Sequence, residues 1–113
     1  MRNMTYKVVI TPHAKSQLEQ YIAYTIKSFK NKQAARAIRD DAIKTRQRLS
    51  DIAPSLALCE NAVLAAQGYR KISFTRHPFF MVYRINGKHV IVEAMYHELQ
   101  DYESVFAHKV STQ

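Results

Sequence analysis

The sequence predicts an α+β fold, in the order β-α-α-β-β-β, in which a hairpin of two helices packs on a small, mostly antiparallel sheet. In the first half of the 113-residue chain, apolar residues recur at intervals of three and four, which is typical of amphipathic helices. In the second half, apolar and polar residues alternate, which is typical of strands with one buried face. We therefore expect a single domain over residues 1–113, with its core at about 6–106 and a polar C-terminal tail.

The first strand and the first helix are predicted from residues 6–29. Residues 6–10 form a short β-prone run, with Tyr6, Val8 and Ile10 on one face. Thr11 fits a helix N-cap, and the proline that follows it fits the first helical position, where no N–H is needed. The apolar stripe of this helix consists of Ala14, Leu18, Ile22 and Ile26, with Tyr21, Thr25 and Phe29 beside it.

A second helix follows after an interruption at residues 30–32. Pro54 ends it, and the short connection predicts that the two helices form an antiparallel hairpin. The stripe of the second helix consists of Ala35, Ile38, Ala42, Thr45, Leu49 and Ile52.

Three strands are predicted after a segment with little pattern, in which residues 62–66 form a helical turn that Gly68 ends. The three strands cover residues 69–75, 79–85 and 88–96. We expect them to form an antiparallel meander, with the first strand of the chain at an edge or beside the last strand. A short helix or extension is predicted through Val105 and Phe106.

Asn86-Gly87 predicts the hairpin turn between the last two strands, because both residues tolerate positive φ. Without a bulge, this turn pairs Phe79 with Ala94 and His77 with Tyr96. The register therefore places His97 near the residues that precede the hairpin.

The charge of the chain predicts a polyanion or an acidic protein as its partner. Lys and Arg number 17 against 9 Asp and Glu, which gives a net charge of +8. Residues 27–48 alone carry eight basic residues and two acidic ones, whereas residues 69–103 carry five and four. The first segment is either a docking surface, with Arg36, Arg39 and Arg46 as contacts, or the solvated face of a helix.

Several function classes are excluded by what the sequence lacks. One cysteine, Cys59, excludes an internal disulfide framework and a Cys-rich zinc site, and the five histidines are too scattered for a metal site. Two glycines cannot form a Gly-rich phosphate loop. There is no apolar run long enough to cross a membrane and no signal peptide. We expect no metal, no cofactor and no membrane partner, and a cytoplasmic location.

The last three strands carry the residue types that RNA cleavage needs. A base removes the proton of a ribose 2′-OH, cations stabilise the charge that develops on phosphate, and an acid protonates the leaving oxygen. The alternative for each residue is an ordinary surface position or the rim of the core. The predicted catalytic residues are His97, Arg70, Lys71, Arg76, His77 and Tyr102, and the predicted RNA-binding residues on the strands are Arg84 and Tyr96.

The order of elements and three segments resemble toxins of the RelE/ParE superfamily of bacterial type II toxin–antitoxin systems. The segments are Gly68-Tyr69-Arg70-Lys71-Ile72, Phe79-Phe80-Met81-Val82-Tyr83-Arg84-Ile85 and Tyr96-His97-Glu98-Leu99-Gln100-Asp101-Tyr102-Glu103. The resemblance implies neutralisation by an antitoxin. It also implies one of two activities, which are mRNA cleavage in the ribosomal A site and poisoning of DNA gyrase.

The resemblance to the nuclease branch is incomplete. That branch has basic residues on its second strand, which Arg70 and Lys71 match, and His97 matches its basic residue at the end of the fourth strand. The arginine of its third strand is replaced by Phe80, unless Arg76 or His77 substitutes from the turn. Our first hypothesis is a metal-independent endoribonuclease that acts on ribosome-bound mRNA. The alternatives are a gyrase inhibitor without nuclease activity and an inactive member that only binds antitoxin.

Overall fold

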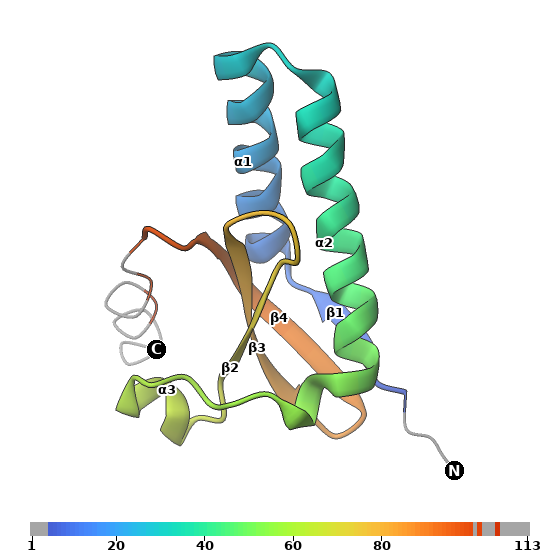
Figure 1. Cartoon of the computed structure of the whole chain (residues 1–113). Coiled ribbons are helices and arrows are strands. Elements are labelled where there is room, and N and C mark those ends of the chain that lie inside the picture. Colours follow the sequence, from blue (N-terminus) through green and yellow to red (C-terminus); the bar gives the residue numbers. More distant parts are fainter. Residues whose placement is uncertain (1–4, 101, 103–105, 107–113) are drawn as a thin grey trace.

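The computed structural model describes residues 5–100, 102 and 106, and it confirms the predicted fold class and order of elements. Its strands and helices are β1 (Lys7–Ile10), α1 (Pro12–Phe29), α2 (Lys32–Ile52), a single 3₁₀ turn (Ala53–Ser55), α3 (Ala62–Ala66), β2 (Arg70–Ser73), β3 (Phe79–Asn86) and β4 (His89–His97) (Figure 1). Of the helix or extension predicted through Val105 and Phe106, only Phe106 belongs to the described residues.

The four strands form one sheet in the order β1-β4-β3-β2. β1 runs parallel to β4 at one edge, as predicted, and the other neighbours are antiparallel. Apolar side chains pack on both faces of this sheet. The α1–α2 hairpin covers one face (Figure 1), and Leu64 of α3 packs on the other together with Tyr102 and Phe106.

The predicted register between β3 and β4 is wrong. Asn86 pairs with His89, so Gly87 and Lys88 form the turn, one residue later than predicted, with Gly87 at φ 62°. A positive φ at the first turn position suits glycine because it has no Cβ.

A β-bulge shifts the register by a further residue. Tyr83 pairs with Val92 and Val82 pairs with Ala94, so Glu93 is the extra residue. The later turn moves each partner on β4 by two residues and the bulge adds one, so Phe79 lies opposite His97 and not opposite Ala94. Tyr96 pairs with Phe80 and not with His77.

The first helix begins at the predicted cap, and the second begins at Lys32, inside the segment predicted as an interruption. The Thr11 hydroxyl accepts a hydrogen bond from the N–H of Ala14 at 3.2 Å, and the Asn31 side chain accepts one from Ala34 at 3.0 Å. These two caps satisfy N–H groups that a helix cannot pair internally.

The predicted stripe of α1 is buried only in its first part. Ala14 and Ile22 belong to the core, but Ile26 and Phe29 are exposed. The physical reason is length, because the hairpin extends past the edge of the sheet and its outer end has no sheet to cover (Figure 1). The stripe of α2, in contrast, is buried from Ala35 to Leu49.

Lys30 ends α1 in the left-handed conformation, at φ 50° and ψ 39°. Glycine or asparagine usually fills this position, because a Cβ is strained there. We expect Lys30→Gly to raise the free energy of unfolding by about 1 kcal/mol. Urea unfolding measures this gain, and Lys32→Gly, inside the first turn of α2, should be destabilising instead. Equal effects of the two substitutions would contradict the strain at Lys30.

Candidate functional site

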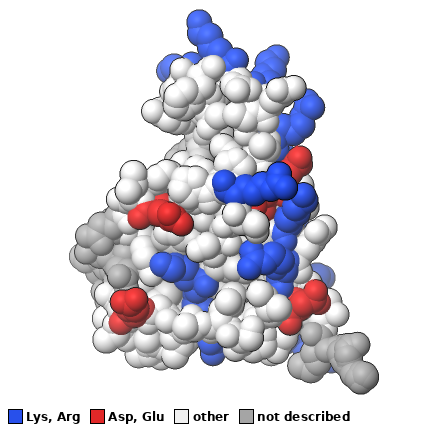
Figure 2. Space-filling view, viewed as in Figure 1, with Lys and Arg blue, Asp and Glu red and all other residues white. Residues whose placement is uncertain are grey.

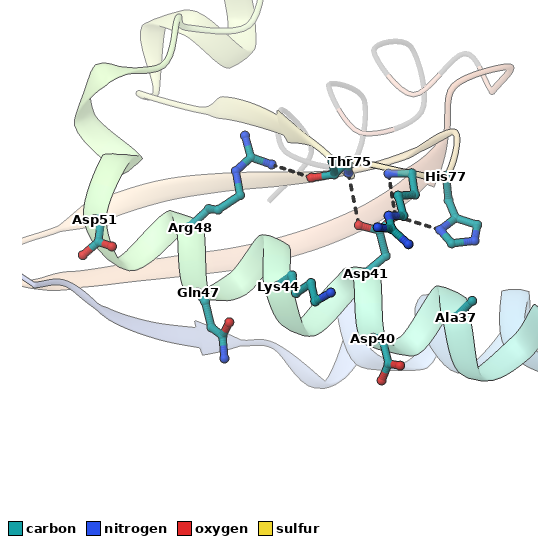
Figure 3. Close-up of a pocket in the computed structure, with 10 residues that line it drawn as sticks. Ala37, Asp40, Asp41, Lys44, Gln47, Arg48, Asp51, Thr75 and His77 are labelled. Carbon is teal, nitrogen blue, oxygen red and sulfur yellow. Dashed lines mark hydrogen bonds and ion pairs between the residues drawn. The ribbon is translucent and has the colours of Figure 1, made fainter.

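A hollow of about 540 Å³ opens between α2 and the loop that joins β2 to β3. Figure 3 shows the side chains of α2 on one side of it and those of the loop on the other. The residues that line it are Ala37, Asp40, Asp41, Lys44, Gln47, Arg48, Asp51, Thr75, Arg76 and His77. Two predicted site residues, Arg76 and His77, therefore lie at this hollow.

The Asp41 carboxylate holds the loop against α2. It is 4% exposed, and it accepts hydrogen bonds from the backbone N–H groups of Thr75 at 3.1 Å and Arg76 at 2.9 Å. The Nδ1 atom of His77 lies 2.7 Å from its second oxygen (Figure 3). Since an ionised carboxylate only accepts hydrogen bonds, Nδ1 carries the proton in this pair.

The surroundings of Asp41 favour its charged form. Burial raises the pKa of the carboxyl group, but the hydrogen bonds from His77, Arg76 and Thr75 together outweigh it and leave the pKa below its ordinary value. A buried carboxylate with these partners is stable as an anion.

The hollow can orient an imidazole beside several cations. A carboxylate bound to Nδ1 fixes the ring and leaves Nε2 as the atom that can accept a proton. Lys44, Arg48 and Arg76 line the same hollow and could hold a phosphate or a carboxylate group. Arg48 also donates to the carbonyl of Ser73 at 3.4 Å and to the Thr75 hydroxyl at 3.3 Å.

Arg70 and Lys71, the other predicted cations, lie on opposite faces of the sheet. Arg70 shares the hairpin-covered face with Ile72 and donates to the carbonyl of Leu56. The Lys71 ammonium lies over the other face, 4.8 Å from the centre of the Phe80 ring and 5.3 Å from that of Tyr102. The two residues are therefore not part of one cation cluster.

The aromatic candidates are part of the core. Tyr96 and Tyr102 are buried against Phe80, with ring centres 6.1 and 4.7 Å from it. Burial also raises the pKa of the Tyr96 hydroxyl. The His97 ring packs edge-on against Phe79 at 5.2 Å, at the end of the sheet that also carries the loop of His77.

Most of the remaining predicted arginines have partners within the chain. Arg84 donates to Glu93 at 2.5 Å, Arg39 binds both oxygens of Glu19, and Arg46 donates to the carbonyl of Val8. Arg36 is exposed. The Tyr69 hydroxyl also donates to Glu93, and burial raises the pKa of Tyr69 to about 12.

Our sequence prediction missed Asp41, Lys44, Arg48 and Glu93. Asp41 carried a usable signal, because it lies beside Ile38, Ala42 and Thr45 on the stripe that was predicted to be buried. A carboxylate on such a stripe needs hydrogen-bond partners from another element. Nothing in the sequence marks Glu93 as a site residue. The bulge that makes it the extra residue of β4 is not predicted, and its carboxylate binds Tyr69 and Arg84.

A second depression, of about 500 Å³, lies beside β1 between the two helices. Its floor is apolar and includes Val9, Leu18 and Ile43, and Val9 and Ile43 are exposed. The basic residues around it are Lys7, Lys15, Arg39 and Arg46, with Glu19 as the acidic one. β1 is the edge strand, so this apolar groove adjoins the outer edge of the sheet, where Arg46 donates to the Val8 carbonyl.

Comparison with known families identifies the chain. Residues 8–102 match the family described as ParE toxin of type II toxin-antitoxin system, parDE. The chain belongs to this ParE toxin family. The match extends from β1 to beyond β4, and it confirms the resemblance to the RelE/ParE superfamily.

A solved structure of the chromosomal ParDE toxin–antitoxin system from P. aeruginosa is similar to this ParE-family chain. The TM-score is 0.68 at 19% identity, and the alignment covers 84% of this chain and 98% of that one. At this identity the likeness shows the fold alone. No curated protein has a significant match.

The described part of the chain holds neither a metal-binding cluster nor a membrane-spanning helix. Within residues 5–100, 102 and 106, no group of three or more His, Cys, Asp or Glu side chains is placed to hold a metal ion. No helix among the same residues is both long and apolar enough to cross a membrane.

Asp41→Asn removes the charge from the hollow but keeps the size of the side chain. We expect a loss of about 2 kcal/mol in the free energy of unfolding at pH 7, since hydrogen bonds to charged groups contribute about 1.5–3 kcal/mol. The pKa of Asp41 is lower in the folded chain than its ordinary value of 3.8. Its contribution is therefore present above pH 3.8 and is lost as the pH falls through the folded-state pKa.

Urea unfolding of both proteins, from neutral pH down to about pH 2, measures this dependence. Asp40→Asn is the matched control, because Asp40 is the exposed neighbour of Asp41 on the same helix. The stability difference between wild type and Asp41→Asn should shrink in acid. A difference that stays constant, or that Asp40→Asn reproduces, would contradict the role of the Asp41 charge.

Proposed function

We propose that this chain arrests growth by inhibiting DNA gyrase, and that an acidic or amphipathic antitoxin segment neutralises it. Its membership of the ParE toxin family supports the gyrase target, because toxins of the ParE type lean toward gyrase poisoning and not toward ribosome-dependent cleavage. The target and the antitoxin would meet it in the cytoplasm.

The observation that carries this proposal is the separation of the predicted nuclease residues. Arg70 and Lys71 lie on opposite faces of the sheet, and Tyr102 is buried. A nuclease needs its base and its cations around one phosphate. A gyrase inhibitor acts by binding and has no such requirement.

Ribosome-dependent mRNA cleavage is the second candidate, and one specific observation supports it. In the hollow, Asp41 orients His77 beside Lys44, Arg48 and Arg76. This set shares Arg76 and His77 with the predicted one, but its other members, Asp41, Lys44 and Arg48, come from α2. In this second candidate, Asp41 is a positioning residue.

Purified toxin should therefore inhibit supercoiling by gyrase, and cells that express it should induce the SOS response. Primer extension on a reporter mRNA should show no new 5′ ends. New ends together with unaffected gyrase would contradict the proposal, and cells that grow normally would indicate an inactive member.

Two variants separate the candidates. His77→Asn keeps an N–H donor for Asp41 but removes the imidazole, and His97→Ala removes the other predicted base. Both should inhibit gyrase as strongly as the wild type. If new mRNA ends form in the wild type and disappear in His77→Asn alone, RNA cleavage in the hollow is the better description.

The apolar groove beside β1 is our proposed antitoxin site. Its basic rim complements an acidic segment, and its exposed apolar floor suits the apolar side chains of the same segment. A helix could lie in this groove, or a strand could pair with the outer edge of β1 and displace Arg46 from the Val8 carbonyl. The similar P. aeruginosa structure is one of a ParDE toxin–antitoxin system, which agrees with such a partner.

Ile43→Asp places a carboxylate on the floor of this groove, where Ile43 is 49% exposed. We expect the affinity for the protein encoded by the adjacent reading frame to fall at least about tenfold, which corresponds to about 1.4 kcal/mol. Calorimetric titration measures it. Val63→Asp on α3 is the control, because Val63 is 40% exposed and does not line the groove. If Ile43→Asp binds the antitoxin as tightly as the wild type does, the groove is not the antitoxin site.

A further inference from the structure

The outer end of the helical hairpin projects beyond the sheet (Figure 1). We call this end the hairpin tip and define it by its exposed apolar and basic residues, which are Tyr24, Ile26, Lys27, Phe29, Lys30, Lys32 and Arg36. The tip lies apart from both the hollow and the groove, because none of these residues lines either one.

Two large aromatic rings are presented to solvent at the tip. Tyr24 is 64% exposed and Phe29 is 68% exposed. Their ring centres lie 6.2 Å apart at an angle of 85°, so the two rings pack edge to face and hold each other in place. An exposed aromatic pair next to charged residues is typical of a binding surface and adds little to the core.

The tip is basic and has no acidic residue. Residues 20–39 contain no Asp or Glu, and four of their cations belong to the exposed surface of the tip. Figure 2 shows the basic character of the tip at the top of the molecule, where Lys and Arg side chains surround uncharged ones and no acidic side chain is visible. The fifth cation, Arg39, is paired with Glu19.

One of these cations occupies a strained position. Lys30 adopts φ 50°, where glycine would relieve the strain. Its side chain is exposed, so the charge of Lys30 is available to a ligand that binds at the tip.

From these observations we infer that the hairpin tip binds single-stranded DNA. Unpaired bases stack on exposed aromatic rings while Lys and Arg contact the phosphates, and this combination is typical of single-strand binding. A duplex hides the faces of its bases, so it leaves the rings unused. A protein partner would also use the two rings, since aromatic residues are enriched in protein–protein interfaces, but it would leave unused the three lysines of the tip, because lysine is depleted there.

The choice of DNA over RNA rests on the proposed function, whose target acts on DNA. The binding of a single strand to the tip does not rest on the proposed function, because it can be measured without gyrase. A chain that binds the strand but leaves gyrase active would contradict the proposed function alone.

Fluorescence anisotropy with a labelled oligothymidylate of about 15 nucleotides tests the inference on the full-length chain. Tyr24→Leu with Phe29→Leu keeps apolar side chains but removes both rings, and we expect at least about a tenfold loss of affinity. Lys27→Gln with Lys32→Gln should reduce the slope of log affinity against log salt by about 1.4, since each phosphate contact on a single strand contributes about 0.7. Lys30→Gly should bind more weakly although its Tm is higher than that of the wild type.

Lys7→Gln with Lys88→Gln is the matched control for charge, because these lysines lie at β1 and at the β3–β4 turn. It should leave the salt slope nearly unchanged. Duplex DNA and oligouridylate of the same length should bind more weakly than oligothymidylate. The inference is overturned if the leucine variant binds like the wild type, if the control loses as much slope as the tip variant, or if either competitor binds as tightly.

Discussion

The buried carboxylate of Asp41 is the interaction on which the arrangement of helices and sheet depends most directly. The apolar stripe of α2 packs on the sheet without a strong directional preference, because burial of apolar surface is non-directional. Asp41 supplies direction, since it accepts two backbone N–H groups of the β2–β3 loop and the His77 ring. It therefore fixes the position of the loop along α2, and with it the shape of the hollow.

The elements of this fold were predictable because their signals are local. Thr11 caps the first helix as predicted, and the apolar stripe predicted for α2 is buried from Ala35 to Leu49. The register of the β3–β4 hairpin was not predictable from the same signals. Asn86-Gly87 allows more than one turn, and no local signal indicates the bulge at Glu93, whose side chain binds Tyr69 and Arg84. Similarly, nothing in the spacing of α1 indicates that its last turn extends past the sheet.

The candidate site was predictable only in part, and for a related reason. Arg76 and His77 were recognised, but their partner Asp41 is distant in the sequence and comes from a helix for which only basic residues were predicted as contacts. Conversely, the alternation that predicts β2 already assigns Arg70 and Lys71 to opposite faces. Residue types suited to one reaction can therefore be adjacent in sequence and still be separated by the sheet itself.

The pairing of β1 with β4 has a consequence for the order in which the protein is made. β4 is the only neighbour of β1 within the described sheet, and Lys7 pairs with His89 across almost the whole chain. Contacts between residues so distant in sequence form late and slow folding. During synthesis, β1 must remain without its partner until β4 has left the ribosome. The sheet, and every surface supported by it, is thus completed only after β4 has been translated.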